Sequence, residues 1–201
     1  MKNKRFGTRE MVTTAMFGAI LLIMSFTPLG YLNIGPLAIS FNMIPVAIGA
    51  IALGPVGGMI LGALFGITSF LQCLGIGGMS AMGVILFEID PFLAFVQRFV
   101  PRLLAGLLAG WVYKGVKRIC NDTVACFVTG FCAALFNTVL FMSALVLLFG
   151  NTEYVQGLIG GRNVIVFICA FVGVNAVVEM IAASAIVGIV GKVLCKFMTR
   201  R

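Results

Sequence analysis

The chain of 201 residues is long enough for one domain and is unusually apolar, with 61% hydrophobic and only 10% charged residues. Soluble globular proteins carry charges on about 25% of their residues, so this composition excludes a soluble enzyme and indicates an integral membrane protein. The net charge of +8 is concentrated in short segments between apolar runs, which is typical of membrane topology and excludes a stripe that follows nucleic acid.

A helix needs about 20 apolar residues to span the hydrocarbon core of a bilayer. Six apolar runs approach this length, so we expect an all-α bundle of six transmembrane helices that forms a single domain over residues 1–201. The expected spans cover residues 11–30, 37–53, 55–73, 91–113, 123–149 and 164–191. Gly54 alone separates the second run from the third, and Pro55 favours the start of a new helix, which predicts a tight helical hairpin.

The basic residues predict how this bundle is oriented in the membrane. They cluster before the first span, between the fourth and fifth spans, and at the end of the chain: Lys2, Lys4, Arg5 and Arg9; Lys114, Lys117 and Arg118; Lys192, Lys196, Arg200 and Arg201. Six spans place all three clusters on the same side, so both termini are expected on the cytoplasmic side of the membrane, in a multi-pass protein that contacts lipid.

Two small residues in the first span are four positions apart, Ala15 and Ala19. Small residues at this spacing form a flat stripe that lets two helices approach closely. Such a pair most often packs inside a bundle, and the alternative is a docking face for a second protein. The spacing alone leaves both interpretations open.

Three ionisable side chains fall inside the expected spans: Arg98, Arg102 and Glu179. Arg102 and Glu179 lie near the middle of their spans, so we expect a structural ion pair in which each residue offsets the cost of burying the other. Arg98 is expected on the same helix face, about 6 Å closer to the outside. Three alternatives remain open for Arg98: a pair with Glu179, a pair with Glu88 or Asp90, and a position in which it reaches the lipid headgroups.

Neutral amide side chains are expected at the depth of Arg98. They are Asn42, Gln72, Gln97 and Asn175. A cation surrounded by amides and open to the outside suits a small solute that carries a carboxylate. We therefore predict a substrate site formed by Arg98, these amides and Glu179, covered by the glycine-rich connections at residues 74–90 and 150–163.

Several kinds of chemistry are excluded by missing motifs. The sequence has no histidine and no Cys-x-x-Cys pair, so the common Cys/His metal sites are absent. It also has no P-loop for ATP. We expect neither an enzyme nor a bound cofactor, and solute transport would need an ion gradient or a partner that hydrolyses ATP.

Four segments resemble a known family of membrane proteins. They are residues 14–19 (TAMFGA), 26–31 (FTPLGY), 44–55 (IPVAIGAIALGP) and 100–106 (VPRLLAG). With these segments the chain resembles the substrate-binding membrane subunits (S components) of energy-coupling factor (ECF) vitamin transporters, and it is most similar to their pantothenate-type branch.

The resemblance implies a function and a set of partners. It implies a high-affinity binding subunit, in the bacterial plasma membrane, of an ECF-type ABC importer for a water-soluble vitamin. Pantothenate is the first expectation, and folate, riboflavin, pyridoxine-type and thiamin-precursor ligands remain open. Ala15 and Ala19 would dock on a transmembrane coupling subunit that two ATPase subunits energise, and Arg98 and Asn175 would contact the vitamin near the outer side. Two other functions remain open: an autonomous proton-coupled secondary transporter that uses Glu179, and a membrane scaffold that transports nothing.

Overall fold

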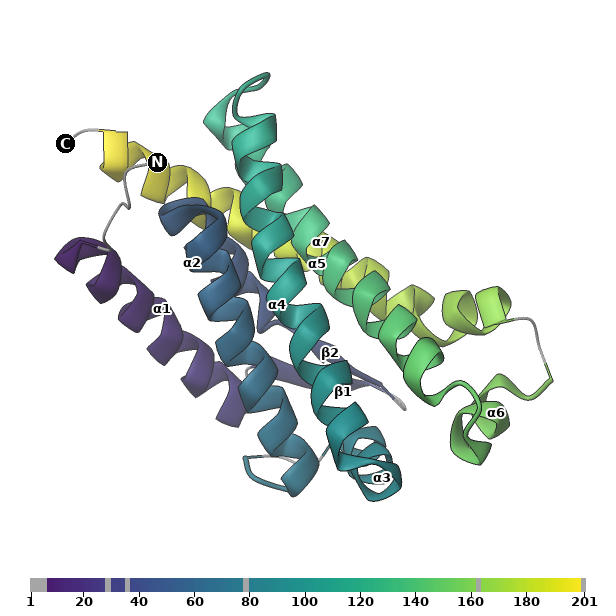
Figure 1. Ribbon diagram of the computed structural model, residues 1–201. Helices are drawn as coiled ribbons and strands as arrows, with labels where there is room; N and C mark the ends of the chain where they lie inside the picture. The colour runs from purple at the N-terminus through teal and green to yellow at the C-terminus, as the bar shows by residue number, and fades with distance from the viewer. Residues whose placement is uncertain (1–6, 28–29, 35–36, 78–79, 162–163, 200–201) are drawn as a thin grey trace, which may run out of the picture.

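The computed structural model describes residues 7–27, 30–34, 37–77, 80–161 and 164–199. Apart from one short hairpin these residues are mainly helical (Figure 1). The elements are α1 Thr8–Phe26, β1 Tyr31–Ile34, β2 Leu37–Ser40, α2 Met43–Leu71, α3 Ala81–Ile89, α4 Pro91–Val116, α5 Asp122–Phe149, α6 Glu153–Ile159 and α7 Val164–Thr199, with a 3-10 turn η2 at Gln72–Leu74. Five of the described helices, α1, α2, α4, α5 and α7, are long and apolar enough to cross a membrane.

Helix α2 consists of two arms, because the chain reverses at Gly54. This residue has φ 79° and ψ −170°, a conformation that glycine adopts easily and that interrupts the helix. Gly49 packs against Leu61, and Gly58 packs against Ala50. In a straight helix these pairs, 12 and 8 positions apart, would be about 18 Å and about 12 Å apart, so the contacts require residues 43–53 and 55–71 to lie side by side. The helical hairpin expected at Gly54 is therefore present.

The first arm is shorter than the span expected at residues 37–53, and this expectation is corrected. Residues 37–40 form strand β2, which pairs antiparallel with β1 so that Tyr31 lies opposite Ser40. The backbone N–H of Phe41 donates to the carbonyl of Gly30 (2.9 Å) and closes the base of the hairpin. The sequence turn signal Gly35-Pro36 falls between the residues of the two strands, and helix α2 starts only after β2, at Met43.

The glycine-rich connections expected after the third and fifth spans each contain a short helix, α3 and α6. Ser80 caps α3, since its hydroxyl accepts a hydrogen bond from the N–H of Gly83, and Thr152 caps α6 in the same way. Asp90 caps α4, which opens with Pro91 at its first turn. Side chains of Ser, Thr and Asp at such positions satisfy backbone N–H groups that the helix leaves free.

Close contacts between backbones hold α4 against the second arm of α2. A Cβ atom at Gly58 would lie 2.3 Å from the carbonyl oxygen of Gly106, and one at Gly62 would lie 2.4 Å from the carbonyl oxygen of Arg102. Small residues allow this approach, as they do between many membrane helices. Helices α5 and α7 meet similarly where Gly130 faces Ala183.

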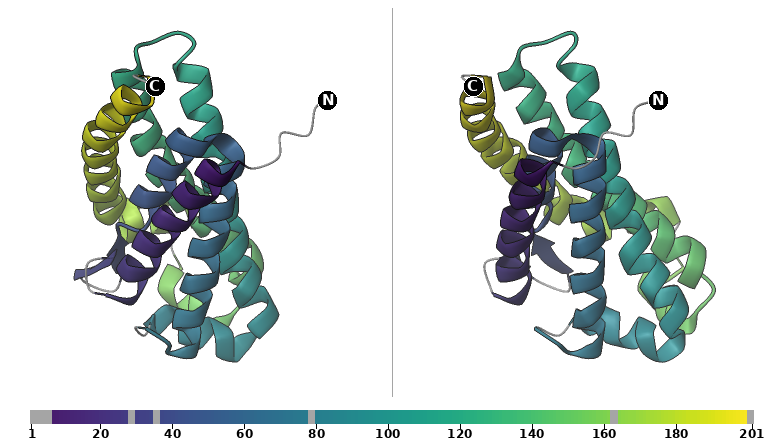
Figure 2. Two further views of the ribbon diagram at one scale, coloured as in Figure 1. Left: turned by 90° about the vertical axis from the view of Figure 1, so that its left-hand side faces the viewer. Right: turned by 60° about the vertical axis from the view of Figure 1, so that its left-hand side comes forward.

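The chain reversal of α2 and the ends of α4 and α7 lie at the same end of the bundle. Gly54 faces the side chain of Lys114, and the Tyr113 hydroxyl lies 3.1 Å from Sγ of Cys195. Figure 2 shows the start of α1 and the connection from α4 to α5 at the same end. The described residues of the basic clusters therefore share one end of the molecule, as the topology prediction requires. Which side of the membrane this end faces remains a prediction.

Candidate functional site

Arg98 lies inside the bundle, with 6% of its surface exposed. Its guanidinium donates hydrogen bonds to the hydroxyls of Ser80 (3.0 Å) and Ser69 (3.5 Å). Its carbon Cζ lies 5.3 Å from the centre of the Phe141 ring. Helix α4 thus presents Arg98 to the end of α2, the start of α3 and the second half of α5.

The burial of Arg98 contradicts two of the alternatives: a position in which it reaches the lipid headgroups, and a pair with Glu88 or Asp90 at the membrane surface. Within the described ranges, no carboxylate lies within 4.0 Å of the Arg98 guanidinium. The ion pair found in these ranges joins Lys117 to Asp122, far from Arg98 in the sequence. Glu88 is exposed, and the carboxylate of Asp90 accepts two backbone N–H groups at the start of α4. The Arg98 guanidinium is therefore a buried cation held by neutral groups.

Arg102 lies one turn further along α4 and is equally buried. Its Cζ is 4.8 Å from the ring centre of Phe65 and 5.0 Å from that of Phe141, so the guanidinium lies close to both rings. Its Nη1 donates to the carbonyl oxygen of Arg98 (2.8 Å). Cation–π contacts of this kind contribute on the order of 1–2 kcal/mol when they are desolvated. Phe141 thus supports both guanidiniums.

Glu179 connects α7 to the β hairpin and to Arg102. Its Oε1 accepts a hydrogen bond from the backbone N–H of Ser40 in β2. The positive charge of Arg102 attracts the Glu179 carboxylate. The predicted partners therefore interact electrostatically, while a direct bidentate contact between them remains a prediction.

The predicted amides fall into different environments. Asn42 and Gln97 are fully buried, and within the described ranges neither amide has a hydrogen-bond partner. Gln72 instead faces α1, where its Nε2 donates to the carbonyl oxygen of Ser25 (2.9 Å). Asn175 is half-buried on α7, one turn before Glu179. The structure therefore separates Gln72 from the other predicted site residues by giving it a partner in the α1 interface.

Several other buried polar atoms lack a protein partner in the part of the chain that the structure describes. They are Nε of Arg98, Oγ of Ser40 and Oδ1 of Asn137. A buried polar group without a hydrogen bond costs about 1–3 kcal/mol, so folded proteins rarely accumulate them. Buried polar atoms of this kind, which here include Nε of Arg98, are typical of a site where a polar ligand or water completes the hydrogen bonds.

Sequence reasoning missed the residues that support the two arginines. Ser69, Ser80, Phe65 and Phe141 come from three different helical elements, and Ser40 contributes only its backbone. The position of Ser80 before a helix start was a detectable capping signal. Nothing in the spacing of the phenylalanines distinguished them from other apolar residues of the spans.

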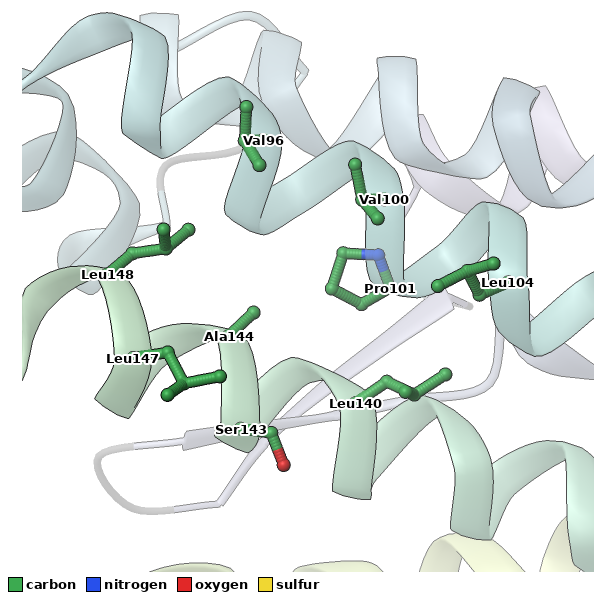
Figure 3. Close-up of a pocket in the computed structure, with 9 residues that line it drawn as sticks. All are labelled: Val96, Val100, Pro101, Leu104, Leu140, Ser143, Ala144, Leu147 and Leu148. Carbon is green, nitrogen blue, oxygen red and sulfur yellow. The ribbon is translucent and has the colours of Figure 1, made fainter.

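A cavity of about 280 Å³ lies between α4 and α5 (Figure 3). Its lining residues are Val96, Val100, Pro101, Leu104, Leu140, Ser143, Ala144, Leu147 and Leu148. None of the predicted site residues belongs to this set, and Ser143 is its only polar member. The cavity therefore suits hydrocarbon, such as a lipid chain, and it is distinct from the polar cluster around Arg98.

Ala15 and Ala19 are exposed on α1, and large apolar side chains such as Met16 and Ile20 are exposed beside them. The buried face of the helix is instead formed by Phe17, Gly18, Leu21 and Ser25. Of the two interpretations of this pair, packing inside the bundle is wrong. The stripe is available to lipid or to a second protein.

The sequence matches the family described as "ECF transporter, substrate-specific component" over residues 9–191. It is 30% identical over 204 residues to the pantothenate transporter PanT of Leuconostoc mesenteroides subsp. mesenteroides, an alignment that covers 96% of this chain and 95% of the relative. It is also 27% identical over 174 residues to the pantothenic acid transporter PanT of Lactococcus lactis subsp. cremoris, covering 80% of this chain and 86% of the relative.

Proposed function

Because the chain belongs to the substrate-specific components of ECF transporters, we propose that it is the high-affinity binding subunit of an importer for pantothenate. Both curated relatives described above carry pantothenate in their names. The observation that carries the proposal is the buried Arg98 guanidinium, which among the described residues has hydroxyls and an aromatic ring as partners but no carboxylate.

The chemistry of this ligand suits the cluster. Pantothenate carries one carboxylate, one amide and two hydroxyls. A carboxylate and a guanidinium form short, charge-assisted hydrogen bonds, and such a bond would occupy the free Nε of Arg98. The unpartnered amides of Asn42 and Gln97 offer both donors and acceptors for the amide and hydroxyls of the ligand. Asn175 and Glu179 would complete the site from α7.

Energy for import would come from partner proteins, since the sequence has no P-loop. In this proposal the exposed Ala15 and Ala19 stripe docks on a transmembrane coupling subunit, and two ATPase subunits energise that subunit. The chain would lie in the cell membrane with both termini in the cytoplasm. The gathering of basic residues at one end of the bundle supports this orientation.

The test is the affinity of the purified protein for pantothenate and for pantothenol, its uncharged alcohol analogue, measured by isothermal titration calorimetry. Replacing Arg98 by Gln is expected to weaken pantothenate binding by about 2–5 kcal/mol, which is at least about 30-fold in Kd. Pantothenol binding should change much less. Arg9→Gln removes an exposed arginine from α1 and serves as the matched control.

Two results would contradict the proposal. Unchanged pantothenate affinity in Arg98→Gln would remove this arginine from the site. Uptake by the chain alone, driven by a pH gradient and lost in Glu179→Gln, would instead establish the secondary transporter. Co-expression with coupling and ATPase subunits is expected to give uptake that depends on ATP.

A further inference from the structure

We infer that the first turn of α3 positions the Arg98 guanidinium for the carboxylate of the ligand, with Ser80 and Gly83 as its positioning residues. The inference rests on the proposed function, in which Arg98 binds that carboxylate. It goes further by assigning the preference for a charged ligand to two residues that act through Arg98.

Ser80 is held in place at the start of α3 by bonds of its backbone and its side chain. Its N–H donates to the carbonyl oxygen of Gln72 in η2 (3.4 Å), and its hydroxyl accepts the N–H of Gly83 (3.3 Å). The same hydroxyl oxygen accepts a hydrogen bond from Nη2 of Arg98 (3.0 Å). A hydroxyl oxygen has two lone pairs, so these two bonds use its full capacity as an acceptor. One side chain therefore both caps α3 and ties it to α4.

Gly83 faces the same nitrogen of Arg98 and leaves room for it. A Cβ atom at this position would lie 2.9 Å from Nη2 of Arg98 and 2.8 Å from Sγ of Cys73, whereas ordinary contact begins near 3.4 Å. A side chain there would force the guanidinium or the thiol to shift. Gly83 is not among the glycines with a positive φ, so its backbone accepts alanine. The need for glycine therefore comes from the neighbouring side chains and not from the backbone.

These contacts leave one edge of the guanidinium free. An arginine carries five N–H donors in a rigid plane. Nη2 donates to Ser80 and Nη1 to Ser69 (3.5 Å), whereas the buried Nε of Arg98 has no partner within the described residues. The N–H of Nε and one N–H of a terminal nitrogen point in the same direction, so a carboxylate can accept both. The two serines thus hold the end of the guanidinium and leave the Nε edge to the ligand.

Fixing the guanidinium matters because its bonds to a carboxylate depend on geometry. Ordering a long, flexible side chain when a ligand binds lowers the affinity, and a side chain that its neighbours already hold avoids this cost. A ligand without the carboxylate gains much less from the oriented edge. Loss of the positioning should therefore weaken the binding of pantothenate more than the binding of pantothenol.

The experiment measures the ratio of the Kd of pantothenol to the Kd of pantothenate, by isothermal titration calorimetry on the purified protein. Ser80→Ala removes the acceptor for Nη2 and is expected to lower this ratio at least about fivefold. Ser80→Thr keeps the hydroxyl and should keep the ratio within about twofold of the wild type. Ser184→Ala is the matched control, because it removes a serine hydrogen bond to the carbonyl of Phe127, between α7 and α5, and should leave the ratio unchanged.

Gly83→Ala provides a second variant if Ser80→Ala does not fold. It keeps the hydroxyl cap of α3, and alanine is favoured over glycine in a helix, so folding should be retained. The added methyl group should displace the guanidinium and lower the ratio at least about fivefold. Gly115→Ala is its control, because a Cβ atom there meets nothing within 4 Å.

A double variant tests whether Ser80 acts through Arg98. In the Arg98→Gln background the guanidinium is absent, so adding Ser80→Ala should change the ratio less than about twofold. A fall as large as the one in the wild-type background would show that Ser80 acts independently of Arg98, and would overturn the inference.

The remaining outcomes separate this inference from the proposed function. Pantothenate binding that depends on Arg98, together with an unchanged ratio in both Ser80→Ala and Gly83→Ala, would overturn the inference and leave the function intact. An equal loss of affinity for the two ligands would also overturn it, since that is the result of a purely structural role. Failure of the wild type to bind pantothenate would overturn both.

Discussion

Replacing Gly62 by alanine tests whether backbone contact between α2 and α4 holds the bundle together. The added Cβ would lie 2.4 Å from the carbonyl oxygen of Arg102, whereas ordinary contact begins near 3.4 Å. The two helices would have to separate by about 1 Å, and overpacking of this size typically costs about 1–3 kcal/mol. The obstacle is backbone, so no change of rotamer can relieve it.

The comparison needs a second glycine, because alanine is intrinsically favoured over glycine in a helix by about 0.5–1 kcal/mol. Gly115 also lies in α4, and a Cβ atom there would meet nothing within 4 Å. Gly115→Ala is therefore expected to keep or slightly raise the free energy of unfolding. Gly62→Ala should lower it, so the two variants should differ by about 1–3 kcal/mol.

The assay is thermal unfolding of the purified variants in one detergent, with and without pantothenate. Because the Gly62 contact is made with the backbone of Arg102, the separation of the helices should also weaken ligand binding in Gly62→Ala. Equal unfolding temperatures for Gly62→Ala and Gly115→Ala would refute the close approach of the two backbones.

Three further predictions follow from contacts elsewhere in the bundle. The Sγ atoms of Cys126 and Cys195 are 3.9 Å apart, so a mild oxidant should join them, and mass spectrometry should detect a disulfide that is absent in Cys195→Ser. Replacing Gln72 by Leu removes its hydrogen bond to the carbonyl of Ser25 in α1. Thermal or denaturant unfolding should show a free energy of unfolding lower by about 0.5–1.5 kcal/mol, and pantothenate affinity should fall less in this variant than in Arg98→Gln. Tryptophan at the exposed Ala15 or Ala19 should block assembly with the coupling subunit in a pull-down, because bulk prevents close helix approach; intact assembly would place the docking surface elsewhere.

The long apolar helices were predictable because length and composition suffice to define them. The chain reversal was predictable too, since Gly54 supplies a left-handed conformation and Pro55 starts a helix well. The hairpin at β1 and β2 was not predicted, because its residues are as apolar as those of a span and periodicity over four residues is ambiguous. The turn signal Gly35-Pro36 was the available clue.

For the candidate site, sequence reasoning identified the charged residues and left out their surroundings. Arg98 and Glu179 stand out because ionisable side chains in a span are rare. The partners of Arg98, Ser69 and Ser80, depend on how α2 and α3 pack against α4, and no local pattern encodes that packing. The bond from Ser40 to Glu179 joins residues 139 positions apart through a backbone group, which any residue type could supply.

The short first arm of α2 has a consequence for where water can reach. Its residues 43–53 span only about 16 Å, roughly half of the 30 Å hydrocarbon core, and β2 continues the chain beside α7. Irregular or extended backbone at membrane depth persists only where protein surrounds it or an aqueous chamber borders it. The Ser40 amide, bonded to Glu179 halfway along a 36-residue helix, therefore marks a place that protein or water, and not lipid tails, must surround.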